Sequence, residues 1–162
     1  MRLAPLSALL GLLTLASAAP AVTLRPGDLL AYSYGPNAPK IYRIDPVTGV
    51  GEPIPTLEPL HDVSGISVAP NGEILFTQVV LNLPRRIAAL DPETGAVRTV
   101  SEFSGGDPDH LLFVPQDVMA TPDGRIFASG AYPPPPGSSN TANGLFEIDP
   151  VTGVQRLLDG SD

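Results

Sequence analysis

The sequence predicts an all-β protein assembled from repeated four-stranded antiparallel units. A five-residue stretch, Asp-Pro-x-Thr-Gly, occurs three times, at residues 45–49, 91–95 and 149–153. A second turn signal, Pro-x-Gly, stands between these copies at 70–72 and 122–124. No segment after residue 20 has the apolar spacing of a helix, so we expect essentially no helix. Turn signals that recur in this way predict a chain of hairpins.

The Asp-Pro-x-Thr-Gly stretch has the chemistry of a tight turn. Asp accepts a hydrogen bond from the backbone two residues on, Pro presets φ at the next position, and Gly adopts the left-handed conformation that returns the chain to a strand. The residues before the first copy, Ile41-Tyr42-Arg43-Ile44, alternate as a strand does. The three turn aspartates are therefore expected to cap turns, not to act in catalysis.

Two hairpins in each repeat make four strands, and the repeats lie about 50 residues apart, which is typical of a β-propeller blade. We expect three blades, at about 21–55, 63–103 and 115–159. The innermost strand of the first blade has only residues 21–25 available, which is barely long enough. The other expected strands are 29–34, 41–45 and 51–55 in the first blade, 65–69, 73–80, 86–91 and 97–103 in the second, and 117–121, 125–132, 145–149 and 154–158 in the third.

Three blades do not close a propeller. Propellers close with four to eight blades, and closure protects the edges and faces of the terminal sheets. The sequence therefore predicts an incomplete β-propeller over residues 19–162. It is expected either to be truncated or to be completed by other copies of the chain, which would associate through the open blade edges.

Residues 1–18 read as a secretory signal peptide, with Arg2, an apolar run over 3–15 and the small residues Ala16-Ser17-Ala18. The run is short for a membrane anchor, so we expect cleavage, no stable membrane span afterwards, and a secreted or periplasmic protein. The absence of Cys excludes disulfides and Cys-based zinc sites. The formal net charge of −8, without a basic stripe, argues against binding to nucleic acid.

The third repeat is longer than the others, with insertions of about six residues within 104–114 and 133–143. Antiparallel alternation places both insertions on one face of the blades, opposite the tight turns. Loops held by a rigid scaffold are where binding sites usually lie. We therefore expect this loop face to bind a protein or a small molecule, which the sequence does not identify.

Both histidines of the chain lie in links between blades on this face, and a pair of arginines lies in a loop within the second blade on the same face. Carboxylates near the histidines suggest a hard cation such as Ca²⁺, and a histidine could also act as a general acid or base. The plainer interpretation is that these are solvated loop residues, because their spacing matches no defined metal loop. No catalytic residue and no other cofactor is assigned. The candidate binding-face residues are His61, His110, Arg85 and Arg86, and the candidate metal ligands are Asp62, Asp107, Asp109, His110 and Asp117.

Two segments, GISVAPNGEILFT at 65–77 and DVMATPDGRIFAS at 117–129, are each followed by a hairpin with the Asp-Pro-x-Thr-Gly turn. They resemble the NHL-type repeat and, more broadly, the blades of the gluconolactonase and streptogramin-lyase families of six-bladed propellers, over residues 24–158. The resemblance to the lactonases implies a calcium ion held by a Glu, Asn and Asp set. The resemblance to the lyases implies a His that acts with Mg²⁺. Neither set has a counterpart at matching positions here. We expect a non-enzymatic binding or scaffold module, and the alternative is a fragment of a metal-dependent propeller hydrolase or lyase.

Overall fold

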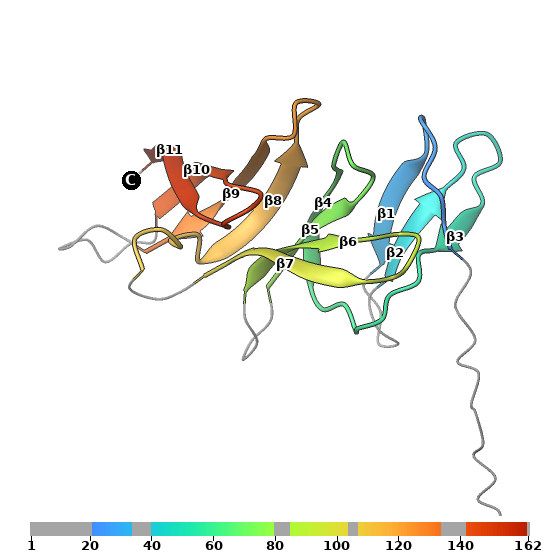
Figure 1. Ribbon diagram of the computed structural model, residues 1–162, viewed down its shortest axis with the longest axis horizontal. Helices are drawn as coiled ribbons and strands as arrows, with labels where there is room; N and C mark the ends of the chain where they lie inside the picture. The colour runs from blue at the N-terminus through green and yellow to red at the C-terminus, as the bar shows by residue number, and fades with distance from the viewer. Residues whose placement is uncertain (1–20, 34–39, 80–84, 104–106, 134–141, 162) are drawn as a thin grey trace, which may run out of the picture.

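The computed structural model describes residues 21–33, 40–79, 85–103, 107–133 and 142–161 (Figure 1). Within these residues the chain forms eleven strands and no helix, as expected. The described part of the chain accordingly contains no helix that is long and apolar enough to cross a membrane. The predicted signal peptide and parts of both insertion loops lie outside the described residues.

The strands form three antiparallel sheets, each with its strands paired in chain order, and Figure 1 shows the sheets following one another across the molecule. This arrangement confirms the predicted partial β-propeller. The first blade consists of β1 (Leu29–Ser33), β2 (Lys40–Ile44) and β3 (Gly51–Pro53). The second consists of β4 (Val63–Val68), β5 (Ile74–Gln78), β6 (Arg86–Leu90) and β7 (Val97–Glu102). The third consists of β8 (Val114–Ala120), β9 (Ile126–Tyr132), β10 (Ala142–Ile148) and β11 (Gln155–Ser161).

The first blade has three described strands, not four. Residues 21–25 form no strand, so the expected inner strand at this position was wrong. The backbone N–H of Val22 instead donates to the carbonyl oxygen of Pro92 at 3.1 Å, and the Val22 side chain is buried. Because its backbone is bonded to the turn of the second blade, this segment lies along that turn and does not pair with β1.

The Asp-Pro-x-Thr-Gly turns have the predicted geometry. In the first, the Asp45 carboxylate accepts hydrogen bonds from the N–H groups of Val47 at 2.8 Å and Thr48 at 3.1 Å, and Gly49 has a φ of +70°. The N–H of Gly49 donates to the Asp45 carbonyl at 2.8 Å. The same bonds recur in the other two copies, which confirms that these aspartates cap turns.

Two apolar layers hold the blades together. One lies between the first and second blades, the other between the second and third. Neighbouring residues of a strand point to opposite faces, so Ile74 and Phe76 of β5 enter the first layer and Leu75 enters the second. The second blade is therefore buried on both faces. Its β5, the second strand from the inner edge of the sheet, has no exposed residue.

Candidate functional site

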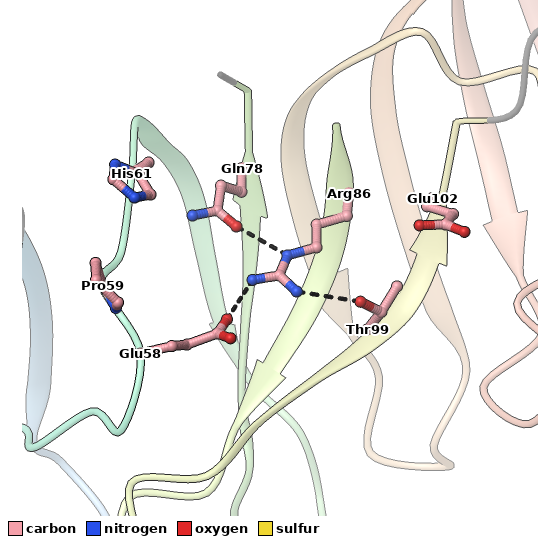
Figure 2. Close-up of a pocket in the computed structure, with 7 residues that line it drawn as sticks. All are labelled: Glu58, Pro59, His61, Gln78, Arg86, Thr99 and Glu102. Carbon is pink, nitrogen blue, oxygen red and sulfur yellow. Dashed lines mark hydrogen bonds and ion pairs between the residues drawn. The ribbon is translucent and has the colours of Figure 1, made fainter. Parts of the chain in front are cut away.

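A polar pocket of about 280 Å³ lies beside the second blade, between its sheet and the link from β3 to β4 (Figure 2). Gln78 ends β5, Arg86 begins β6 and Glu102 ends β7, so the pocket opens at the ends of the strands that carry the loops. This is the face on which sequence reasoning expected binding. The lining residues are Glu58, Pro59, His61, Gln78, Arg86, Thr99 and Glu102.

The guanidinium of Arg86 holds the pocket together. Its Nε donates to Oε1 of Gln78 at 2.8 Å, and one terminal nitrogen donates to Oγ1 of Thr99 at 3.2 Å. The other terminal nitrogen is paired with the carboxylate of Glu58, as Figure 2 shows. The side chain of Arg86 is 19% exposed, whereas that of its partner Glu58 is 41% exposed, so the ion pair lies at the border with solvent. A guanidinium with partners on three sides is fixed in position.

Strand register brings these side chains together. Arg86 is the cross-strand partner of Gln78 on one side and of Glu102 on the other, so the three side chains stand in a row on one face of the sheet. A bulge in β7 then separates Thr99 from Ser101. Since the bulge shifts the alternation of side chains by one residue, Thr99 also lies on the exposed side.

His61 forms the link side of the pocket. The next residue, Asp62, has a φ of +38°, a left-handed conformation that Asp tolerates better than most residues. The carbonyl of Asp62 accepts a hydrogen bond from Val79 at 3.3 Å, which fixes the bend before the buried Val63. No described residue makes a hydrogen bond or an ion pair with the His61 ring, which lines the pocket.

Arg85, which sequence reasoning grouped with Arg86, lies elsewhere. Adjacent residues of an extended chain point to opposite sides, so the two guanidinium groups diverge. Arg85 stacks on the ring of Phe113 at 3.8 Å and donates to the Phe113 carbonyl at 3.3 Å. The ring of Phe103 meets Phe113 edge-on at a centroid distance of 5.0 Å. Arg85 therefore holds the link before β8 and does not line the pocket.

His110 is also separate from the pocket. Its Nδ1 lies 2.8 Å from Oδ2 of Asp107, and the other oxygen of Asp107 accepts a hydrogen bond from the N–H of Asp109 at 2.9 Å. The N–H of Asp109 and the His110 ring hold the pKa of Asp107 below its usual range. The carbonyl of Asp109 accepts a hydrogen bond from Gln155 at 2.8 Å. This group therefore belongs to the third blade.

The five candidate metal ligands do not lie together as one group. Asp117 stands on β8, where its carboxylate accepts a hydrogen bond from Val118 at 2.9 Å, and Asp62 lies next to the pocket residue His61. Of the five, only Asp107 and His110 form a close side-chain pair. Across the described residues, no three His, Cys, Asp or Glu side chains are placed to hold a metal ion. Calcium binding therefore stays a prediction from the sequence.

Five pocket residues were missed by sequence reasoning: Glu58, Pro59, Gln78, Thr99 and Glu102. Cross-strand pairing could have indicated Gln78 and Glu102, because both lie opposite Arg86 in the hairpins that the turn signals define. No comparable signal exists for Glu58, because its place depends on the path of the irregular link before β4.

No protein-family model matches the chain, and no curated protein is similar to it in sequence. The resemblance to NHL-type and gluconolactonase blades therefore stays a prediction. Among solved structures, the chain is similar to TolB from Acinetobacter baumannii, with 21% identity and a TM-score of 0.43 over 83% of this chain and 41% of that one. It is also similar to a puromycin hydrolase, with 20% identity and a TM-score of 0.48 over 85% of this chain and 22% of that one.

The chain thus spans less than half the length of either similar structure. Similarity at these identities carries no information on function. What the chain itself establishes is an all-β fold of successive antiparallel sheets in the arrangement of a partial β-propeller, with a polar pocket at its loop face.

Proposed function

We propose that this protein is an extracytoplasmic binding module of the β-propeller type, and that it holds its ligand at the loop face around Arg86. The observation that carries the proposal is the polar pocket itself. It lies on the face that the chain topology singles out for binding, and it includes two of the four residues chosen there, His61 and Arg86. Sites on a rigid sheet hold their side chains more accurately than sites built only from loops.

The lining favours a small polar group. Glu58 and Glu102 supply acceptors, Arg86 supplies donors, and His61 supplies either. Since Glu58 already balances the charge of Arg86, the remaining acidic group is Glu102. A volume of about 280 Å³ is at the low end for ligand pockets, which suits a single polar group with a cationic nitrogen, either free or on a larger partner.

The held position of Arg86 supports binding rather than catalysis. Three of its N–H groups are bonded to described side chains, which favours recognition by a preformed surface. Among the described residues, His61 has no partner of the kind that orients a general base. The proposed location outside the cytoplasm is supported by the signal-peptide pattern of residues 1–18.

The two histidines allow a direct test. His61 lines the pocket and His110 does not, so their ring-proton resonances form a probe and an internal control in one spectrum. We expect millimolar lysine or a lysine-containing dipeptide to shift the His61 resonance and leave that of His110 unchanged. Glycerol and glucose, which have no cationic group, are the control compounds.

A Glu102→Gln variant sharpens the test. Glu102 is exposed at the end of β7 and its carboxylate has no partner among the described residues, so the substitution leaves the fold intact while it removes a negative charge from the pocket. The lysine-induced shift should fall several-fold in this variant. An unchanged His61 resonance at every amine concentration, or equal shifts at both histidines, would count against a ligand site at this pocket.

A further inference from the structure

The three turn glycines differ in what surrounds them. A Cβ on Gly95 would lie 3.0 Å from the carbonyl oxygen of Pro55, and one on Gly153 would lie 2.6 Å from that of Val100. Both glycines are buried against the preceding blade. Gly95 lies against the segment just after the outer strand β3, and Gly153 lies against the outer strand β7. Gly49, at the same place in the first blade, is exposed and has no atom within 4 Å of such a Cβ. Among the described residues, no outer strand packs against the Gly49 turn of the first blade.

The outer strand of the third blade has the matching feature. In the second blade, the bulge of β7 leaves Val100 as the extra residue, and Val100 is 7% exposed beneath the third blade. The same bulge recurs in β11, where the extra residue is Leu158. Leu158 is 39% exposed, so a side chain shaped for contact with a following blade has none among the described residues.

The first and third blades each have one open face, the face turned away from the second blade. Other apolar side chains on these open faces are also exposed, although their counterparts in the other blades are buried. Leu29 in the first blade is 55% exposed, whereas its repeat counterparts Ile74 and Ile126 are buried. Leu145 in the third blade is 42% exposed, whereas its counterpart Ile87 is buried. Each open face thus repeats a pattern that is covered elsewhere in the same chain. A shallow apolar groove of about 190 Å³ crosses the open face of the third blade, lined in part by Met119, Phe127 and Leu145.

Charges on the open face of the third blade do not prevent such a contact. Glu147 there is paired with Arg125 and Arg156. The same three repeat positions of the first blade hold the pairs of Arg43 with Asp28 and Glu52, so the signs are reversed. In the first blade this group lies beside the second blade, and the side chains of Arg43 and Asp28 are only 15% and 8% exposed. The second blade therefore packs against the ion-paired group of the first blade, and the ion-paired group around Glu147 allows a blade to pack against the third in the same way.

We propose that the open face of the third blade binds the open face of the first blade of a second copy, with the β11 bulge at Leu158 seated on the turn at Gly49. The contact between the second and third blades is the template for this interface. It is heterologous, and two copies supply two such contacts. The described residues of one copy form three blades, so two copies make six, within the range of four to eight in which propellers close. The proposed assembly is a closed ring of two chains.

Gly49→Asn tests the seat. Asn tolerates left-handed backbone, and the side chain would enter open space in a single chain. In the proposed contact it would meet the backbone of β11, as a Cβ on Gly153 would meet Val100. The matched control is Gly124→Asn, because Gly124 has a φ of +87° and also has no atom within 4 Å. In sedimentation velocity at micromolar concentrations, we expect dimers for the wild type and for Gly124→Asn, and monomers for Gly49→Asn.

Leu158→Asp tests the opposite face and the head-to-tail geometry. This variant should also be monomeric, since it places a charge in the proposed contact. A mixture of Gly49→Asn and Leu158→Asp should regain dimers, because each variant keeps the face that the other has lost and one intact contact forms. Association of the mixture should be at least tenfold weaker than that of the wild type, which has two contacts.

Three results would overturn the proposal. One is a monomeric wild type up to the highest soluble concentration, which would leave these faces to a blade of another chain. The second is a Gly49→Asn variant that dimerises as well as Gly124→Asn. The third is a wild-type mass that keeps increasing with concentration beyond two chains, because a ring of two copies has no free face for a third.

Discussion

The side-chain amide of Gln155 donates a hydrogen bond to Oγ of Ser101 at 2.9 Å, across the contact between the second and third blades, and both residues are buried. The side-chain oxygen Oε1 of Gln155 accepts a second hydrogen bond, from the backbone N–H of Leu112 at 2.6 Å. The Ser101 hydroxyl in turn donates to the carbonyl of Gly153 at 2.6 Å. One amide therefore joins the outer strand of the second blade to the link, the turn and the outer strand of the third.

Replacement of this amide should be costly. Gln155→Leu keeps the approximate volume but leaves the Leu112 N–H without its acceptor, and a buried group that loses its partner costs about 1–3 kcal/mol. We expect the free energy of unfolding, measured by urea denaturation, to fall by that amount. The control is Gln116→Leu at an exposed position of β8, which should change stability by less than about 0.5 kcal/mol. Equal losses in the two variants would show that the network does not bridge the blades.

The turn glycines allow close contact as well as left-handed backbone. Gly153 and Gly124 both have positive φ, at +76° and +87°, but only Gly153 lies against another blade. Asn at either position incurs a similar backbone cost, so the difference between the two variants measures the steric contact. We expect Gly153→Asn to be destabilised by about 1–3 kcal/mol more than Gly124→Asn in urea unfolding. A difference near zero would mean that the blades separate at this turn without cost.

The three bonds of Arg86 require a guanidinium. In Arg86→Lys the ammonium is a compact point charge that cannot reach Gln78, Thr99 and Glu58 together. Because Glu58 is 41% exposed, solvent screens that pair, and we expect a total loss of only about 1 kcal/mol. The His61 ring resonance should shift in the variant, since the pocket wall rearranges. Arg25→Lys is the control, as Arg25 is exposed, and it should alter neither stability nor the His61 resonance.

Acid should weaken the turns. Backbone N–H groups of Thr48 and Val47 lower the pKa of Asp45, and the Thr94 hydroxyl and the Glu93 N–H lower the pKa of Asp91. A carboxylate whose pKa is lower in the folded than in the unfolded chain stabilises the fold above the unfolded pKa of about 3.9. That contribution is lost as the pH falls through the lower folded pKa.

We therefore expect the urea midpoint to fall below about pH 4, with a shallower pH dependence in Asp91→Asn, which keeps an acceptor oxygen but does not titrate. The comparison variant is Asp109→Asn, whose side chain caps no turn among the described residues, since only its backbone N–H and carbonyl are hydrogen-bonded there. Parallel pH profiles for the wild type and Asp91→Asn would contradict the role given to this carboxylate.

Much of the fold could be predicted because it depends on local chemistry. The turns at Asp45, Asp91 and Asp149 lie where their residue types place them, since an Asp acceptor, a Pro and a left-handed Gly all act within five residues. The strands between these turns were predicted from the alternation of apolar and polar residues. The prediction of an inner strand at residues 21–25 was wrong because the backbone of Val22 is hydrogen-bonded to Pro92, far away in the sequence, and not to a neighbouring strand.

The pocket depended on contacts that sequence spacing does not contain. Two adjacent arginines have the same propensities and the same formal charge, yet Arg86 enters the pocket and Arg85 stacks on Phe113. The two histidines were equivalent by position in their links, but only His61 borders the pocket. Side-chain direction was set by register and by the β7 bulge, which are properties of paired strands.

By itself, the sequence determined where the chain turns and which residues alternate, because those choices are made over a few neighbouring residues. The tertiary structure alone decided which identical turns are covered. Gly49, Gly95 and Gly153 stand in the same motif, and only the last two have a blade packed against them. Packing depends on what lies beside a surface in space, and no local rule of backbone conformation contains that information.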